Sequence, residues 1–152
     1  GRYRQRQNLA SIESRGIELD GRLGWGAFAV TLSGAFVDAT VTGGGLDGLR
    51  PAQAPELSGS IAGSYRGDGL AASVTLRHLG PRFEDDQNSR RLPAATTLDA
   101  DADLRISGPL SVTFAVENLF DARIATGFSG DQFERGQPRT VWLGIRVSAA
   151  GS

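Results

Sequence analysis

The sequence contains neither cysteine nor methionine among its 152 residues. Without cysteine it has no disulfide framework and no thiolate metal site. No apolar run approaches the roughly 20 residues that a membrane-spanning helix needs. The formal net charge is −1, which argues against the basic surface that a nucleic-acid partner requires. Because methionine is missing even from position one, we expect the chain to be a fragment of a longer protein.

Helical periodicity is nearly absent, and strict alternation of apolar and polar residues takes its place. In Thr96–Ser107, apolar residues such as Leu98 and Leu104 occupy every second position, while aspartates fill the gaps. Period-two alternation is typical of a β-strand with one apolar and one polar face. We expect Tyr3–Asn8 to be the tail of a further strand. Six other alternating stretches are residues 15–23, 28–36, 57–65, 70–78, 110–118 and 140–148.

Short and long connections alternate along the chain. The short ones are rich in glycine, aspartate or proline, as tight turns require. This alternation predicts an up-and-down meander with all its long loops at one end, which is typical of an outer-membrane barrel. The short turns are Gly24–Gly26, Arg66–Gly69 and Ser107–Pro109, and the long loops are Asp38–Pro55, Gly80–Ala95 and Leu119–Pro138.

The predicted fold is all-β, an antiparallel up-and-down meander of seven or eight strands that forms part of a transmembrane β-barrel. The aspartates then line a polar lumen and the apolar face meets lipid, where Arg or Lys near the midplane costs about 2–4 kcal/mol. Trp25, Phe28 and Tyr65 lie near the short turns, where an interfacial aromatic girdle is expected. The apolar face is predicted to hold Ile17, Leu19, Val30, Leu32, Leu76, Leu98, Leu104, Val112, Phe114, Leu143 and Ile145.

Four stretches together resemble one family. They are Ser14–Asp20 (SRGIELD), residues 80–104 (a charged loop, Leu-Pro, then a strand), Val116–Ile124 (VENLFDARI) and Gly136–Val147 (GQPRTVWLGIRV). In this order they resemble the carboxy-terminal β-barrel of TonB-dependent receptors, the outer-membrane importers of siderophores and other scarce nutrients. The resemblance implies a bacterial outer-membrane location, lipid around the barrel and no cofactor.

The family also sets expectations about what lies outside this chain. Its members have an amino-terminal plug inside a twenty-two-stranded barrel, which 152 residues cannot hold. We therefore expect residues 1–152 to be the carboxy-terminal barrel segment, with a periplasmic energy-coupling protein acting through the missing plug. The family's last strand usually ends in an aromatic residue, whereas here the position in phase after Val147 is Ala149.

The long loops hold the candidate ligand residues. Phe83–Arg91 mixes three carboxylates with two arginines, and two phenylalanines lie in a loop of small and polar residues. The alternative is a solvated charged loop with aromatic residues that hold it to the barrel rim. The carboxylate spacing matches no metal loop. We expect a small-molecule nutrient, such as a ferric chelate, to contact Arg82, Asp85, Asp86, Arg90, Arg91, Phe128, Asp131 and Phe133.

Several further residues have structural interpretations. Asn118 and Asp121 follow a strand, where Asn and Asp stabilise turns through side-chain-to-backbone hydrogen bonds. Antiparallel pairing should bring Arg77 opposite the aspartate row, near Thr97, Asp99 or Asp101, where opposite charges attract.

Two other functions remain open at this stage. One is a complete eight-stranded outer-membrane barrel with a structural or adhesive role, and the other is a soluble β-sandwich that binds a ligand. An enzyme is the weakest interpretation, because His78 is the only histidine and acyl transfer needs a base held beside a nucleophile. Because a sheet cut from a barrel exposes two edges, we expect the isolated chain to need detergent or to associate.

Overall fold

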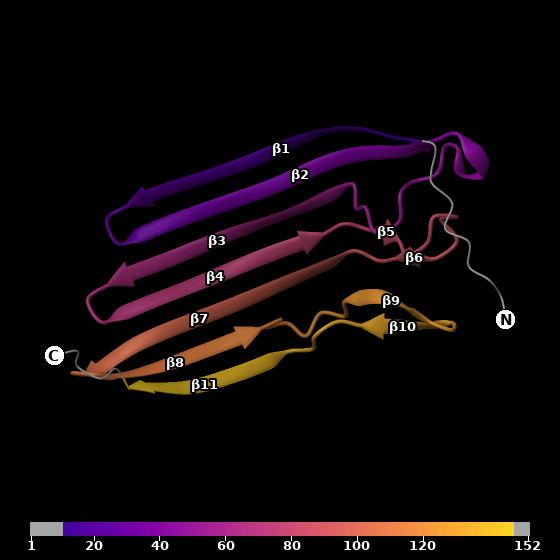
Figure 1. Ribbon diagram of the computed structural model, residues 1–152. Helices are drawn as coiled ribbons and strands as arrows, with labels where there is room; N and C mark the ends of the chain where they lie inside the picture. The colour runs from indigo at the N-terminus through magenta and orange to yellow at the C-terminus, as the bar shows by residue number, and fades with distance from the viewer. Residues whose placement is uncertain (1–10, 148–152) are drawn as a thin grey trace.

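The computed structural model describes residues 11–147, which form one seven-stranded antiparallel sheet and two short two-stranded ladders at one of its ends (Figure 1). The order in the sheet is β1-β2-β3-β4-β7-β8-β11, so each strand lies beside its neighbour in the chain apart from the ladder strands. The strands are β1 (Ser11–Trp25), β2 (Phe28–Thr42), β3 (Leu57–Gly67), β4 (Leu70–Leu79), β5 (Arg82–Phe83), β6 (Arg91–Leu92), β7 (Ala95–Ser107), β8 (Leu110–Glu117), β9 (Ala125–Ser129), β10 (Gln132–Arg135) and β11 (Thr140–Val147).

This architecture confirms the seven-stranded antiparallel meander predicted from alternation. The one helical segment among the described residues is a 3₁₀ turn, η1 (Gly44–Leu46). No helix within residues 11–147 is long and apolar enough to cross a membrane. The stretch proposed as an eighth strand, Tyr3–Asn8, lies outside the described residues.

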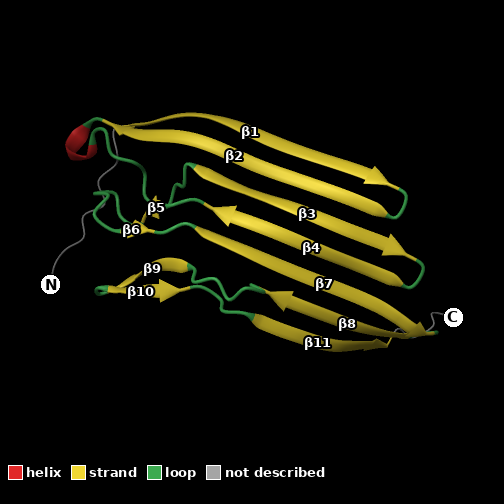
Figure 2. Cartoon of the chain, turned by 180° about the vertical axis from the view of Figure 1, so that it is seen from behind, coloured by secondary structure: helices red, strands yellow, loops and turns green. Residues whose placement is uncertain are grey.

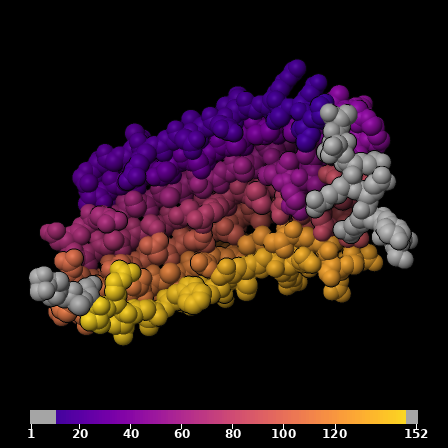
Figure 3. Space-filling model, viewed as in Figure 1, coloured from indigo at the N-terminus to yellow at the C-terminus, as the bar shows by residue number. Residues whose placement is uncertain are grey.

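The pairing register places every predicted apolar-face residue on one face of the sheet. Residues directly opposite in an antiparallel pair share a face, and Ile61 lies opposite Leu76, which lies opposite Leu98. Nothing among residues 11–147 covers this face, since Leu143 is 77% exposed and Ile17 74%. Neighbouring strands are nevertheless in continuous contact from the β1 edge to the β11 edge (Figure 3). The described part of the chain thus provides no protein core on the apolar side of the sheet.

The apolar band has the height of a membrane interior. In β1 it runs from Ile17 to Trp25, about 26 Å along a strand that rises about 3.3 Å per residue. A tilt of about 40° shortens this to about 20 Å along the membrane normal, close to the roughly 25 Å band of outer-membrane barrels. At the loop end the same face turns polar, where Arg15 lies opposite Asp38.

The first long connection begins later than the sequence predicts. Its expected start was Asp38, but β2 continues to Thr42 because β1 begins at Ser11 and supplies a partner for every added residue. Val41, in this extension, is fully buried. The other two long connections contain ladders that alternation did not predict: β5 pairs with β6 in one, and β9 with β10 in the other.

The three aromatic residues predicted to form an interfacial girdle cluster at the turn end of the apolar face. The ring centroids of Trp25 and Phe28 are 6.3 Å apart, and those of Phe28 and Tyr65 are 5.0 Å apart. All three belong to the apolar phase, because Phe28 lies opposite both of the others. Such a group matches the position of an interfacial aromatic girdle.

Candidate functional site

The three long connections gather at one end of the sheet, opposite the short turns (Figures 1 and 2). We call residues 43–56 the first loop, 80–94 the second loop and 118–139 the third loop, and the three together the loop cluster. Buried side chains concentrate in this region, including the fully buried Leu92 of β6 and the buried Ala125 of β9. The loops therefore form a packed unit.

Arg82 joins all three loops. Its side chain is at the limit of burial, with 9% of its surface exposed. The Nε–H group donates a 2.8 Å hydrogen bond to Gln53 Oε1 of the first loop. An Nη2–H group donates a 3.1 Å hydrogen bond to the carbonyl oxygen of Ala125 in the third loop. A buried guanidinium needs such partners to offset its lost hydration, so Arg82 holds the loops together.

The first and second loops have further backbone contacts. Asn88 accepts a 2.9 Å hydrogen bond from the Arg50 N–H and donates a 2.8 Å bond to the Arg50 carbonyl. The Gln53 N–H donates to the Phe83 carbonyl at 2.7 Å. Gln53 and Asn88 both have left-handed backbone conformations, with φ of 59° and 55°, which are uncommon outside glycine. These contacts hold both residues in their unusual conformations.

Asp85 shapes the tip of the second loop. Its carboxylate accepts 3.0 Å hydrogen bonds from the backbone N–H groups of Ser89 and Arg90, and another from the Ser89 hydroxyl. Burial would raise the pKa of Asp85, but the hydrogen bonds from Ser89 and Arg90 outweigh it and lower that pKa. The ionised Asp85 side chain thus stabilises this turn.

Glu84 and Arg90 connect the second loop to the β9–β10 hairpin. The Phe128 N–H donates a 2.9 Å hydrogen bond to Glu84 Oε1, and the Arg90 guanidinium lies 5.5 Å from the centre of the Phe128 ring. Within the described chain, Glu84 Oε2 is buried without a hydrogen bond, with Arg90 Nη1 3.7 Å away. Phe133 packs on Phe128 at a ring distance of 4.7 Å.

The exposed candidates line the outside of the cluster. Asp86, Arg91, Asp131 and Phe133 are all exposed. Asp131 and Phe133 border a groove of about 610 Å³, a size suited to a small ligand. The remaining lining residues are Pro93, Arg123, Ile124, Ala125, Gln132 and Arg135.

The base of the third loop depends on Asn118, which is buried. Its amide donates to the Ala122 carbonyl at 2.9 Å and to the Gln137 carbonyl at 3.2 Å, and its Oδ1 accepts from the Ala122 N–H at 2.8 Å. Asp121 accepts from the Arg139 N–H at 3.0 Å. These bonds agree with the structural roles predicted for Asn118 and Asp121.

The polar face of the sheet carries paired charges. Arg77 lies opposite Thr97 and its guanidinium forms an ion pair with Asp99, as predicted. Asp99 also accepts a 2.8 Å hydrogen bond from the Asn118 N–H. A second pair joins Arg146 to Asp103 at 3.1 Å. Two of the three aspartates in the row are therefore paired with arginines from other strands, while Asp101 accepts a hydrogen bond from the Ser73 hydroxyl.

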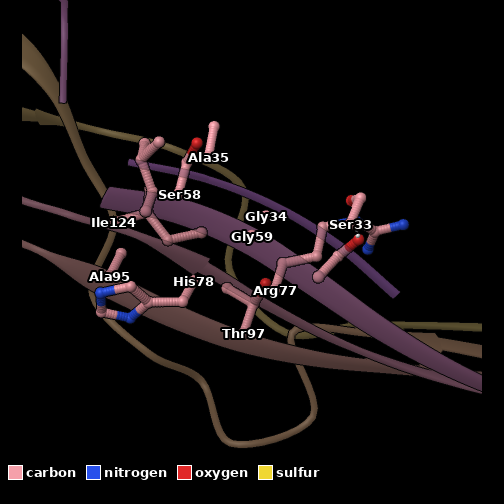
Figure 4. Close-up of a pocket in the computed structure, with 12 residues that line it drawn as sticks. Ser33, Gly34, Ala35, Ser58, Gly59, Arg77, His78, Ala95, Thr97 and Ile124 are labelled. Carbon is pink, nitrogen blue, oxygen red and sulfur yellow. Dashed lines mark hydrogen bonds between the residues drawn. The ribbon is translucent and has the colours of Figure 1, made fainter. Parts of the chain in front are cut away.

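Below the loop cluster, the polar face contains a hollow of about 490 Å³ (Figure 4). Small side chains from β2 and β3 form one side, including Ser33 and Ser58, while Arg77 and Thr97 contribute from β4 and β7. Ile124 of the third loop reaches its edge. Small side chains leave this hollow open, and the Ser33 and Ser60 hydroxyls on its wall hydrogen-bond to each other at 3.0 Å.

The structure separates the eight predicted ligand residues into two groups. Arg82 and Asp85 are engaged in contacts that hold the loops, and Arg90, Phe128 and Phe133 also pack between the second and third loops. The other three, Asp86, Arg91 and Asp131, are exposed. Sequence reasoning missed Gln53 and Glu84, which connect loops, and Arg123 and Arg135, which border the groove. No group of three or more His, Cys, Asp or Glu residues that could hold a metal ion occurs among residues 11–147.

The described residues form one large sheet with an exposed apolar face, besides the two short ladders, which argues against a two-layered soluble sandwich. Strands β1 and β11 are the edges of that sheet and do not pair with each other. A complete eight-stranded barrel would need Tyr3–Asn8 as a further strand between these edges, and that stretch lies outside the described residues.

Known structures share this fold. The ferric yersiniabactin uptake receptor FyuA from Yersinia pestis aligns with a TM-score of 0.78 at 19% identity, over 90% of this chain and 23% of that one. The ferric citrate transporter FecA, in its unliganded form, gives 0.78 at 19% identity, over 89% and 24%. The siderophore receptor PiuA from Acinetobacter baumannii gives 0.75 at 14% identity, over 90% and 21%. This chain thus spans less than a quarter of each.

A comparison with curated protein sequences gave no significant match. The family model described as "TonB dependent receptor-like, beta-barrel" matches residues 1–119, more than three quarters of the sequence. With its seven-stranded wall, exposed apolar band and packed loop cluster, the chain belongs to the TonB-dependent receptor-like β-barrel family of the bacterial outer membrane.

Proposed function

We propose that this chain is the carboxy-terminal wall segment of a receptor that imports a scarce nutrient, with a ferric chelate as the cargo. One observation carries the proposal: three long loops form a packed cluster at one end of a membrane-height sheet, and the second and third of these loops border a groove of about 610 Å³. The receptors FyuA and FecA are named for ferric yersiniabactin and ferric citrate, which supports a chelate for this chain too.

The loop cluster would face the cell exterior and make first contact with the nutrient. Arg90, Arg91 and the phenylalanines offer cationic and aromatic surface for an anionic or aromatic chelate. Arg82 and Asp85 would contribute by holding the loops in place. The lumen hollow beneath would then receive the solute. Direct contact of the nutrient with any of the eight residues stays a prediction.

In this proposal the segment performs no covalent chemistry. Transport energy would reach the receptor from a periplasmic coupling protein acting through a plug outside residues 1–152. The segment's share is lumen wall, lipid contact and nutrient capture.

The test uses the full-length receptor on cells, with uptake of radioactive iron supplied as citrate, catecholate and hydroxamate chelates. The double variant Arg91→Ala/Phe133→Ala removes exposed cationic and aromatic surface but leaves the Arg82 and Arg90 contacts intact. We expect uptake of the cognate chelate to fall about tenfold at equal surface abundance. Arg15→Ala, on the outer face, is the matched control. Unchanged uptake by the double variant would contradict capture by these loops.

A further inference from the structure

The groove of about 610 Å³ between the second and third loops combines apolar and cationic lining. Phe133, which is 50% exposed, and Pro93 supply apolar surface. Arg123 and Arg135 supply two guanidinium groups, against the single carboxylate of Asp131. Within residues 11–147, neither of these arginines has a carboxylate oxygen within 4.0 Å. The described part of the chain thus leaves the positive charge of the groove without an ion-pair partner.

The base of the β9–β10 hairpin fixes the spacing of these two arginines. Arg135 lies opposite Ala125, and Arg123 precedes Ala125 by two positions. The Gly136 N–H donates a 2.8 Å hydrogen bond to the Ile124 carbonyl, so the pairing continues between the direct neighbours of the two arginines. Diagonal neighbours in an antiparallel pair lie on the same face, roughly 7–8 Å apart. Both guanidinium groups can therefore contact one compact ligand.

Ile124 shows that the groove lies next to the lumen. It lines both the groove and the hollow on the polar face of the sheet (Figure 4). Close packing holds it there, since a Cβ atom at Gly136 would lie 3.2 Å from the Cβ and Cγ2 atoms of Ile124. The groove therefore adjoins the lumen side of the wall, which favours a water-soluble solute over a lipid headgroup as its ligand.

We infer that Arg123 and Arg135 determine specificity in this groove and select iron chelates of net negative charge, those built from carboxylates or catecholates. The oxygen atoms of such a chelate accept charge-assisted hydrogen bonds from both guanidinium groups, while Phe133 contacts its organic part. A hydroxamate chelate, in which the charges of the ligand and the ferric ion cancel, gains less from the two arginines. This inference rests on the proposed function, because it names the class of nutrient that the loops capture.

The experiment measures the binding of radioactive iron chelates to the full-length receptor in outer-membrane vesicles. The chelates are ferric citrate, a ferric catecholate and a ferric hydroxamate without net charge. We expect one of the two anionic chelates to bind about tenfold more tightly than the hydroxamate, or better. Arg123→Gln/Arg135→Gln should weaken that binding about a hundredfold, because two charge-assisted hydrogen bonds are lost. Arg123→Lys/Arg135→Lys, which keeps both charges, should preserve most of it.

The matched control is Arg139→Gln, which alters an exposed arginine of the third loop that does not border the groove. It should bind the chelates like the unaltered receptor, and equal abundance in the vesicles shows that the variants fold. Tightest binding of the hydroxamate, or binding of an anionic chelate that survives both glutamine substitutions, would overturn this inference and leave nutrient capture by the loops standing. Binding of none of the chelates would contradict the proposed function and this inference together.

Discussion

The seven-stranded sheet and the loop cluster differ in what shields their apolar side chains from water. In the sheet, large apolar residues such as Leu143 and Ile145 stay exposed, so their burial depends on lipid. In the loop cluster, Leu92 is fully buried and even Arg82 is nearly so. The loops therefore have a protein core of their own, whereas the apolar face of the transmembrane sheet is buried only by the surrounding lipid.

The largest effect should come from emptying the loop core. Leu92→Ala creates a cavity in a packed environment, which costs about 2–5 kcal/mol. We expect the opening free energy of the loop cluster to fall by this amount, measured by amide hydrogen exchange of the full receptor. Leu143→Ala, on the lipid-facing side, should leave loop exchange unchanged. Equal acceleration of the loops by both variants would remove the distinction between the two regions.

The second-largest effect should come from placing a charge on the apolar face of the sheet, compared with the same charge on the polar face. Leu32→Arg places a guanidinium in the middle of the apolar band and should lower the free energy of unfolding in lipid vesicles by about 2–4 kcal/mol. The neighbouring Ser33→Arg points to the polar face and should cost much less. Urea titration in vesicles measures both. Similar losses would show that the two faces do not meet different solvents.

Removing the Arg82 side chain should release the loops from one another. Arg82→Ala leaves Gln53 and the Ala125 carbonyl without their donor, a loss of about 1.5–3 kcal/mol for a hydrogen-bonded charged group. Amide exchange should accelerate in all three loops while the strands keep their protection. The matched control is Arg91→Ala, an exposed arginine in the same loop. Acceleration confined to the second loop would contradict the joining role.

The ion pair on the polar face should have a small effect. Arg77→Ala should lower the free energy of unfolding by roughly 0.2–1 kcal/mol. Asp99→Arg should do more harm, because it also replaces the acceptor of the Asn118 N–H and sets two cations side by side. The free energies of unfolding of the Arg77 variant, the Asp99 variant and the double variant form a double-mutant cycle. This cycle measures the coupling energy between the two side chains. A coupling of zero would mean that the pair contributes nothing.

The smallest effect should be that of acid on the second loop. The folded pKa of Asp85 is lowered, so its stabilising hydrogen bonds are complete above the ordinary value of 3.8 and are lost as the pH falls through the lower folded value. The tip of the second loop should loosen only in that acid range, as followed by NMR of the Ser89 and Arg90 amides. Asp85→Asn should abolish this pH dependence. A transition near neutral pH would contradict the assignment.

The sheet was largely predictable because its chemistry is local. Alternation in Thr96–Ser107 and its counterparts fixes the strands, and the shared phase fixes their faces. The sequence did not predict the extension of β2 past Asp38, because a charged residue at a position of the apolar face indicates the end of a strand. Its partner Arg15 lies 23 positions earlier and becomes visible only in the pairing register.

The loop cluster was less predictable because its contacts are distant in sequence. Arg82 and Arg91 look alike in a charged loop, yet only Arg82 reaches partners 29 and 43 positions away. Alternation likewise assigns Arg66 and Arg105 to the polar face, but only the assembled fold shows that both border one hollow of that face. Side-chain burial in loops thus needs the assembled fold.

The central claim is that the two faces of this sheet meet lipid and lumen. Single cysteines from position 98 to 104, possible because residues 1–152 contain none, can carry nitroxide spin labels in receptor reconstituted into lipid vesicles. Accessibility to lipid-dissolved oxygen, measured by electron paramagnetic resonance, should alternate with period two. It should be high at Leu98, Ala102 and Leu104 and low at Asp99 and Asp103. Equal accessibility along the strand, or the opposite phase, would contradict the account.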